Sequence, residues 1–327
     1  MNTPSYSGII TNYVCTAECR HCMFGSSPSC PKEYISAEDA ENIASLLEEA
    51  DTPSVHIGGG EPFMNFSALL SLIDALNRHN IGVDYIETNA FWAKNEDLVK
   101  ERLWELTKRG VTTVMVSVDP FHIEYVPLAR VLTLMKLLNE EGFDYFVWQE
   151  RYLRKLIKLD HNRTYTKPEL EKILGKNYIA DTAGEYGLGM NGRALAISYD
   201  IYPPKTVAEL LESLPCRNLL SAQHCHFDLY GNALPSGCPG LCAESRDYLC
   251  GNIHPDKYPV MSRLLEGGIR SLYKYVVKQG FTPKSTAYPT KCVLCYEMRS
   301  YLARNHCSPD ISPMCFYENI DKTLSDK

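Results

Sequence analysis

Apolar residues follow two alternating periods along the first 150 residues of the chain, and this alternation predicts strands and helices in turn. Short apolar runs predict strands at 8–14, 54–58, 83–88, 112–118 and 143–148. Apolar residues at helical spacing predict the helices between them, at 36–50, 66–79, 96–109 and 127–141. Strands that alternate with helices favour a parallel sheet with right-handed crossovers.

The pattern is less regular after residue 150. The segment 150–182 is helical and polar, and a further strand is expected near 185–190. This strand brings the count to about six βα units, fewer than the eight of a complete barrel. The predicted fold class is therefore α/β, with a partial (βα)6 TIM-type barrel over 1–212 and a small cysteine-rich α+β domain over 213–327.

Polar motifs follow four of the predicted strands at the point where each strand ends. They are Cys15, then Gly59–Pro62, Thr88–Asn89 and Ser117–Asp119. Parallel βα folds bind ligands beyond the carboxyl ends of their strands, so these motifs are expected to meet on one face. Each motif also has a structural interpretation, as a turn or as a helix cap. Their shared position favours a binding site.

Composition and charge narrow the class of protein. Hydrophobic residues make up 45% of the 327 residues, enough for a large core, and the net charge of −7 argues against a nucleic acid or an anionic membrane as a partner. No run is long and apolar enough to span a bilayer, and the N-terminus lacks the features of a signal peptide. The expected location is the cytoplasm.

The distribution of the thirteen cysteines indicates two metal sites. Four precede residue 31, none lies between 31 and 215, and nine lie from 216 onward. Disulfides are rare in a reducing compartment, so metal ligation explains these thiols better. Cys15, Cys19 and Cys22 can hold three irons of a four-iron cluster and leave the fourth iron open. Zinc is the alternative, but a structural zinc site usually has four protein ligands.

The CxxxCxxC loop at 15–22, followed by the GGEP motif at 59–62, resembles the radical S-adenosylmethionine (SAM) superfamily over about residues 8–195. The resemblance implies a [4Fe–4S] cluster on the three cysteines, with SAM chelated to the open iron. His21 stands where the family often has an aromatic residue near the adenine, which is a mild departure. The resemblance implies these SAM contacts: Gly59, Gly60, Glu61, Pro62, Thr88, Asn89, Ser117, Asp119 and Arg193.

The same resemblance implies the reaction. One electron reaches the SAM sulfonium, the C5′–S bond breaks, and a 5′-deoxyadenosyl radical removes a hydrogen atom from the substrate. An external donor such as flavodoxin or ferredoxin would supply the electron. His122 and Gln149 are candidates for a catalytic acid, base or substrate contact, and a structural role for His122 is an equal alternative.

The second cysteine-rich region contains a predicted hairpin from Cys225 to Cys238 with a Gly231–Asn232 turn, followed by a Cys292–Cys295 pair. This arrangement resembles the SPASM and twitch extensions, and it implies one auxiliary iron–sulfur cluster, or two. The implied ligands are Cys216, Cys225, Cys238, Cys292 and Cys295, with Cys242, Cys250, Cys307 and Cys315 as further candidates. A zinc site with buried free thiols is the alternative, and Cys30 is interpreted as unligated.

Three functions from different classes remain open at this point. The auxiliary region favours post-translational modification of a ribosomally made peptide. A small-molecule enzyme, for example in tetrapyrrole or other cofactor synthesis, is the second, and a non-enzymatic iron–sulfur electron carrier is the third. The GGEP motif argues against a carrier, which has no need to bind SAM. Because the chain begins almost directly with the first strand, a separate partner is expected to deliver a peptide substrate.

Overall fold

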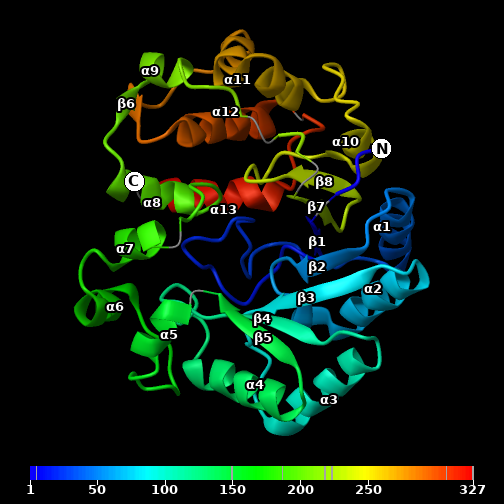
Figure 1. The fold of residues 1–327 in the computed structure, drawn as a ribbon. Coiled ribbons are helices and arrows are strands. Elements are labelled where there is room, and N and C mark those ends of the chain that lie inside the picture. Colours follow the sequence, from blue (N-terminus) through cyan, green and yellow to red (C-terminus); the bar gives the residue numbers. More distant parts are fainter. Residues whose placement is uncertain are drawn as a thin grey trace.

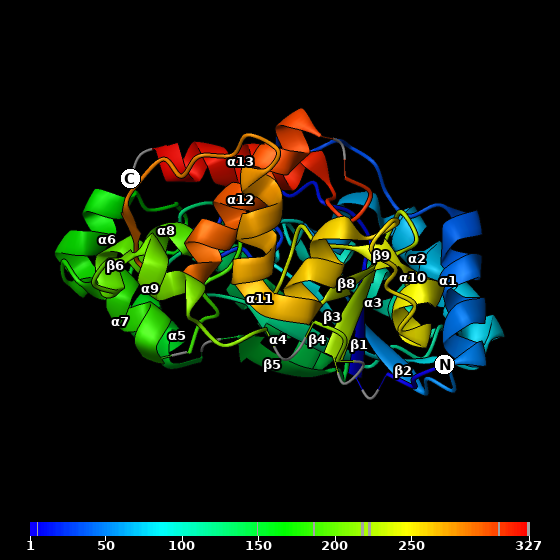
Figure 2. The same cartoon turned by 90° about the horizontal axis from the view of Figure 1, so that it is seen from above.

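A computed structural model describes residues 1–4, 6–148, 150–185, 187–216, 219–221, 224–306 and 308–325. An eight-stranded sheet in the order β5-β4-β3-β2-β1-β7-β8-β9 crosses the molecule (Figures 1 and 2). The six strands from β5 to β7 in this order run parallel. Their bounds are β1 (Tyr6–Ile10), β2 (Ser54–Gly58), β3 (Gly82–Thr88), β4 (Thr113–Ser117), β5 (Asp144–Trp148) and β7 (His224–Asp228).

The first four helices lie between consecutive strands, within one or two residues of the predicted positions. The side chains of Ser36, Asn65 and Asn95 each accept a backbone N–H three residues further on, which caps three of these helices. Apolar stripes such as Leu69 and Leu72 are fully buried against the sheet. The helices are α1 (Ala37–Glu49), α2 (Phe66–Arg78), α3 (Glu96–Thr107) and α4 (Leu128–Glu140).

The prediction of a strand near 185–190 is wrong. Helix α7 (Tyr178–Glu185) precedes a turn here, and Gly187 and Gly192 in this turn have φ values of +56° and +52°. Closely spaced glycines weaken a strand and suit a turn. The sixth parallel strand is instead β7, which pairs with β1 on the side opposite β2. The first strand is also shorter than expected, because β1 ends at Ile10 rather than residue 14.

The predicted hairpin is confirmed. Strand β7 pairs antiparallel with β8 (Asn232–Pro235), and Gly231 between them has a φ of +77°. Strand β9 (Ala243–Glu244) extends the same sheet. The hairpin thus belongs to the main sheet, although it follows the predicted domain boundary at 212/213, which remains a prediction.

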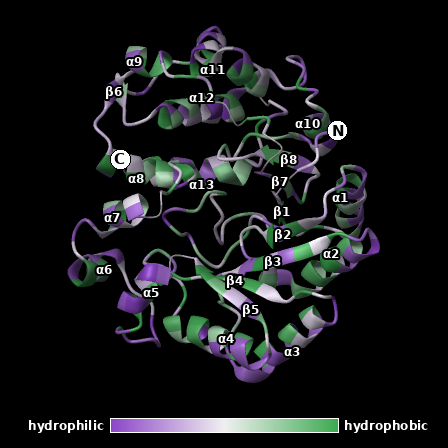
Figure 3. Ribbon diagram, in the orientation of Figure 1, coloured by the Kyte–Doolittle hydropathy of each residue, from purple (hydrophilic) through white to green (hydrophobic). Residues whose placement is uncertain are grey.

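The remaining helices lie beside and above the strands. In Figure 1, α11 and α12 lie above the hairpin, and α13 lies between them and the cysteine loop. Hydrophilic and hydrophobic positions alternate along α3 and α4, while β3 carries hydrophilic positions (Figure 3). In the described part of the chain, no helix is long and apolar enough to cross a membrane. The further elements are η1 (Pro62–Asn65), α5 (Glu150–Leu156), α6 (Lys167–Leu174), α8 (Ala194–Ile201), β6 (Lys205–Thr206), α9 (Val207–Leu211), α10 (Ser245–Cys250), α11 (Pro259–Val277), β10 (Ala287–Tyr288), α12 (Lys291–Asn305) and α13 (Met314–Ser325).

Candidate active site

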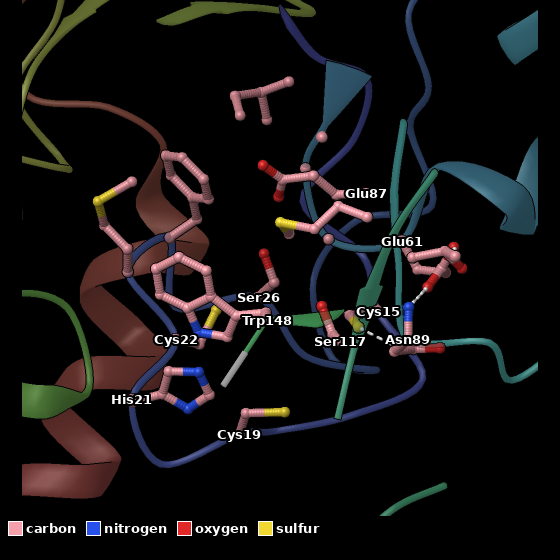
Figure 4. A pocket seen from close by; sticks show the side chains of 18 of the residues that line it. Cys15, Cys19, His21, Cys22, Ser26, Glu61, Glu87, Asn89, Ser117 and Trp148 are labelled. Atoms are coloured by element: carbon pink, nitrogen blue, oxygen red, sulfur yellow. Dashed lines mark hydrogen bonds between the residues drawn. The ribbon is translucent and has the colours of Figure 1, made fainter. Parts of the chain in front are cut away.

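A cavity of about 500 Å³ lies inside the curved sheet and extends to the carboxyl ends of its strands. This volume lies within the usual range for small-molecule sites, about 300–1,000 Å³. Figure 4 shows the three cysteines of the loop around the same pocket as Glu61 and Trp148. The predicted residues that line it are Cys15, Cys19, Cys22, Gly59, Gly60, Glu61, Pro62, Thr88, Asn89, Ser117, His122 and Arg193.

The cysteine loop follows β1 and is closed by backbone hydrogen bonds. The N–H of Cys15 donates to the carbonyl of Ser27 at 3.1 Å, and the N–H of Cys22 donates to the carbonyl of Cys19 at 3.0 Å. Burial, together with the neighbouring Cys19, raises the pKa of the Cys15 thiol well above its ordinary value. A bound metal cation would lower this pKa again, because cysteine binds metal ions as the deprotonated thiolate.

The spacing of the sulfur atoms fits a polynuclear cluster better than a single ion. Four thiolates around one zinc ion lie about 3.8 Å from one another, given a Zn–S bond of about 2.3 Å. Among the described residues, the groups of three or more possible ligand atoms within 4.8 Å of one another contain only histidine and aspartate. At least one pair of the three sulfur atoms therefore lies more than 4.8 Å apart, farther than in a single-zinc site and in keeping with ligands of different irons.

Glu61 presents a buried carboxylate to the cavity and is held by three donors. Its Oε1 accepts the Thr88 hydroxyl at 2.9 Å and the N–H of Phe63 at 3.1 Å, and its Oε2 accepts the N–H of Asn89 at 2.8 Å. Burial raises the pKa of Glu61 to about 7 despite these hydrogen bonds. A fixed and buried carboxylate of this kind suits a charge-assisted hydrogen bond to an ammonium group.

Gly59 and Gly60 are required by the contact of β2 with the loop after β1. A Cβ on Gly60 would lie 2.1 Å from the carbonyl oxygen of Val14, and one on Gly59 would lie 2.7 Å from that of Asn12. Gly59 also has a φ of +139°, which side chains rarely adopt. The glycines thus let Glu61 lie beside the cysteine loop. Their predicted contact with SAM remains a prediction.

Arg193 fastens the cysteine loop from the side. Its side chain donates from Nε to the carbonyl of Cys19 at 2.8 Å and from Nη2 to that of Ser26 at 2.6 Å. Its backbone N–H donates to the carbonyl of Cys22 at 3.0 Å. A Cβ on the preceding Gly192 would lie 2.3 Å from the carbonyl oxygen of Met23, so only glycine fits there. Arg193 therefore positions the loop and brings a positive charge close to it.

Asp119 lies behind two histidines and is not among the residues that line the cavity. Its Oδ2 lies 3.0 Å from Nδ1 of His122 and 3.5 Å from Nε2 of His21. Burial lowers the pKa of His21 to about 4. Burial acts in the same direction on His122, but the Asp119 carboxylate and Cys19 raise its pKa well above the ordinary value. His122 thus lies beside Cys19, a predicted cluster ligand. Gln149 lies outside the described residues.

Sequence reasoning missed several residues that line the inner part of the cavity. These are three histidines and their neighbours: Tyr6, His56, Tyr85, Glu87, Trp148, His224 and His226. The signal for two of them was the period of two in His224 and His226, which puts both side chains on one face of a strand. This period could have predicted a place in the cavity only if residues 224–228 had first been assigned to the main sheet.

A second and smaller cavity, of about 40 Å³, lies under the C-terminal helices. Its lining includes the side chains of Cys216, Cys238, Cys292 and Cys295 together with Arg299. The last two cysteines are in the first turns of α12, which Thr290 caps. Four thiols from three separate segments thus surround one space.

The other cysteines lie elsewhere. Cys225 is in β7, fully buried, and its thiol contacts Ser7. Cys242 donates to the carbonyl of Pro309 at 3.6 Å. Cys315 hydrogen-bonds to Cys30, and this bond lowers the pKa of Cys30. Cys250 is exposed, and Cys307 lies outside the described residues.

Sequence comparison identifies the family. The profile of the Radical SAM superfamily matches residues 9–156. Mycofactocin maturase MftC of Mycolicibacterium smegmatis is 34% identical over 290 residues, which cover 80% of this chain and 68% of the relative. Putative peptide biosynthesis protein YydG of Bacillus subtilis is 25% identical over 126 residues, which cover 37% of this chain and only 38% of that relative.

The solved structures that match the chain have low sequence identity to it. Native anSMEcpe with bound AdoMet superposes with a TM-score of 0.46 at 14% identity and covers 98% of this chain and 100% of that chain. Streptococcus suis SuiB bound to precursor peptide SuiA superposes with a TM-score of 0.44 at 17% identity. This match covers 96% of this chain and 76% of that chain.

The parallel sheet and the three-cysteine loop at its carboxyl edge define an iron–sulfur enzyme of α/β fold. The chain belongs to the radical SAM superfamily. Membership implies SAM and one [4Fe–4S] cluster as cofactors.

Proposed function

We propose that the chain modifies a ribosomally made peptide by radical SAM chemistry. The observation that carries the reaction type is the connection from Cys15 through Asn89 to Glu61, which joins the cluster loop to a carboxylate suited to the SAM ammonium. Bound together, a reduced cluster and SAM supply a 5′-deoxyadenosyl radical that removes a hydrogen atom from the substrate.

The residues of the chain bind and orient these cofactors. Cys15, Cys19 and Cys22 would ligate three irons and leave the fourth open for SAM. All three cysteines line the large cavity. Arg193 keeps the loop in place through two carbonyl groups. A protonated His122 beside Cys19 would offset part of the negative charge of a cluster with thiolate ligands.

In its ionised form, the Glu61 carboxylate would accept a hydrogen bond from the SAM amino group. Thr88 and the backbone of Asn89 hold this carboxylate so that it cannot rotate away from the cavity. Ser117 and Trp148 line the opposite strands, β4 and β5, where the remainder of SAM and the substrate would contact the wall. Gly59, Gly60 and Pro62 complete the predicted contacts.

The relatives support a peptide as substrate. One is named for the maturation of mycofactocin and another for peptide biosynthesis. The concave face also presents large aromatic side chains, and Trp148 on the edge strand β5 is 41% exposed. Exposed aromatic surface of this kind is typical of sites that bind other chains. An external electron donor and a separate protein that delivers the peptide, all in the cytoplasm, complete the proposal.

We assign an auxiliary [4Fe–4S] cluster to Cys216, Cys238, Cys292 and Cys295. These four thiols line one cavity, and Arg299 beside them brings a positive charge. With four protein ligands the cluster would have no open iron, which suits electron transfer rather than substrate binding. In this assignment residues 1–212 supply the first five parallel strands of the SAM-binding barrel, and residues 213–327 supply its sixth, β7, and carry the auxiliary cluster.

Iron content and SAM cleavage test the proposal together. After anaerobic reconstitution, the wild-type chain should contain about eight irons and form 5′-deoxyadenosine with a strong reductant. Replacing Cys15, Cys19 and Cys22 by alanine should remove about four irons and all cleavage. Cys250→Ala is the matched control and should change neither. Unchanged iron and cleavage in the triple variant would refute the proposed function.

A further inference from the structure

Three histidines converge at the inner wall of the large cavity, on strands that flank β1 from both sides. His56 is on β2, and His224 and His226 are on β7. One ring nitrogen from each lies within 4.8 Å of those from the other two. These side chains have no role in the cluster binding or SAM binding proposed for the cysteine loop and Glu61. The cluster is therefore a feature of its own, within the same cavity.

Gly8 on β1 makes the convergence possible. In the two ladders of β1, Gly8 is the register partner of both His56 and His226. A Cβ on Gly8 would lie 2.4 Å from Nε2 of His56 and 2.4 Å from Cδ2 of His226. Any larger residue would push the two imidazoles apart. Three neighbouring strands thus provide a space that holds the histidines together.

The nitrogen positions match those of ligands around one metal ion. Nε2 of His56 lies 3.3 Å from Nε2 of His226. Two nitrogens bound tetrahedrally to zinc lie about 3.3 Å apart, given Zn–N bonds of 2.0–2.1 Å. Nε2 of His224 is buried and has no hydrogen-bond partner among the described residues. Buried polar atoms are nearly always paired, so an unpaired imidazole nitrogen indicates a missing ligand.

Aromatic rings fix the orientation of the cluster. The ring of His56 stacks on Tyr6 at 4.8 Å and on Tyr85 at 5.1 Å between centroids, and the two tyrosine hydroxyls are hydrogen-bonded to each other. Glu87 on β3 brings Oε1 to 3.9 Å from Nε2 of His56. Figure 4 shows Glu87 in the same pocket as Cys15 and Glu61. A carboxylate is thus available on the cavity side of the histidines.

We propose that His56, His224 and His226 bind one divalent transition-metal ion, for which zinc is the best fit. Imidazole is a preferred ligand of zinc, and three histidines with an open fourth position are typical of sites that bind an exchangeable ligand. The open position faces the cavity, where Glu87 or water fills it until an anionic group of the substrate takes its place. The replacement of Glu87 or water by a substrate group rests on the proposed function, whereas metal binding does not.

Metal content of the reconstituted holoprotein tests the site. Loaded with zinc chloride and then desalted, the wild type should retain about one zinc per chain in addition to its iron. His224→Ala and His226→Ala should each retain less than a tenth of that zinc, with iron unchanged. His161→Ala is the control, because His161 binds the carbonyl of Ile157 and does not line the cavity. Equal zinc in all four proteins, or none in the wild type, would overturn the proposal.

X-ray absorption at the zinc edge needs no variant and separates this site from a cysteine site. The expected first shell is nitrogen and oxygen at about 2.0–2.1 Å, whereas a sulfur shell at about 2.3 Å would assign the zinc to thiolates and refute the histidine site. A histidine cluster that only exchanges protons would show no bound zinc. Loss of SAM cleavage with zinc retained would contradict the proposed function and leave the metal site standing.

Discussion

The side-chain amide of Asn89 lies 3.5 Å from the sulfur of Cys15. The backbone N–H of the same asparagine donates to Glu61 at 2.8 Å. One residue at the end of β3 therefore contacts both a predicted cluster ligand and the carboxylate expected to bind SAM. A shift of either group is transmitted to the other through a single short connection.

We expect Glu61→Gln to weaken SAM binding by a factor of about ten to one hundred. The variant keeps the size of the side chain and loses the charge, and a hydrogen bond to a charged group contributes about 1.5–3 kcal/mol. Calorimetric titration with SAM under anaerobic conditions measures the change. The exposed Glu101→Gln is the matched control and should bind like wild type. Wild-type affinity in Glu61→Gln would exclude Glu61 from the SAM site.

SAM affinity should depend on pH through Glu61. Burial raises its pKa to about 7, above the ordinary value, so the free protein binds a proton there at neutral and lower pH. The hydrogen bond from the SAM amino group needs the ionised Glu61 carboxylate. Affinity should therefore increase from about pH 6 to about pH 8 and then level off.

Proton release measures this coupling directly. Titrations in two buffers of different ionisation enthalpy count the protons released, including the one that the SAM amino group loses when it binds iron. The wild type should release most of one proton more than Glu61→Gln at pH 6.5, and the two proteins should release nearly the same number at pH 8. Because the folded pKa is raised, ionisation of Glu61 opposes folding, and its contribution to stability falls as pH rises from about 4.5 to 7. Affinity independent of pH would contradict the raised pKa.

Arg193→Gln should loosen the cysteine loop. The substitution removes the bonds to the carbonyls of Cys19 and Ser26 in a site where Arg193 is 4% exposed. Loss of buried charged hydrogen bonds should lower the free energy of unfolding by about 3 kcal/mol. Thermal unfolding and iron retention after desalting measure the effect. Arg151→Gln, on an exposed helix face, should match wild type in both.

Gly60→Ala should displace the segment that carries Glu61. Its new Cβ would lie 2.1 Å from the carbonyl oxygen of Val14, a contact that only backbone movement can relieve. Overpacking of this kind typically costs about 1–3 kcal/mol. We expect a lower melting temperature together with weaker SAM binding. Gly184→Ala is the control, because its Cβ would meet nothing within 4 Å and alanine favours the helix.

The auxiliary ligands can be separated by two serine variants. In a chain that already lacks Cys15, Cys19 and Cys22, Cys216→Ser should lose the remaining iron and its EPR signal. Cys225→Ser should keep both, because Cys225 is buried beside Ser7 outside the second cavity. The opposite pattern would show that the hairpin strand supplies the ligand.

Local patterns predicted the elements up to β5 and the cofactor loop, because short-range periodicity and a contiguous motif determine them. They could not predict which segment pairs with the free edge of β1. That partner, β7, lies more than 200 residues away along the chain, and a glycine-rich turn at 187–192 resembled a strand. The histidine cluster depends on this pairing, since Gly8 brings His56 and His226 together only when β1 lies between their strands.

The two feet of the hairpin illustrate a second limit. A hairpin brings its strands together, which predicted that Cys225 and Cys238 share a centre. Side chains alternate along a strand, however, and Cys225 points to the face opposite to that of His224 and His226. Cys238 lies beyond the end of β8, where the alternation no longer applies.

The pairing of β1 with β7 also sets an order of events during synthesis. The strand and the cysteine loop after it are among the first residues made, yet one edge of that strand stays unpaired until residues 224–228 emerge. Long-range pairing of this kind forms late and slows folding. Arg193 likewise reaches the loop only after most of the barrel has been translated. Closure of the sheet and fixing of the loop therefore both wait for residues that lie far along the chain.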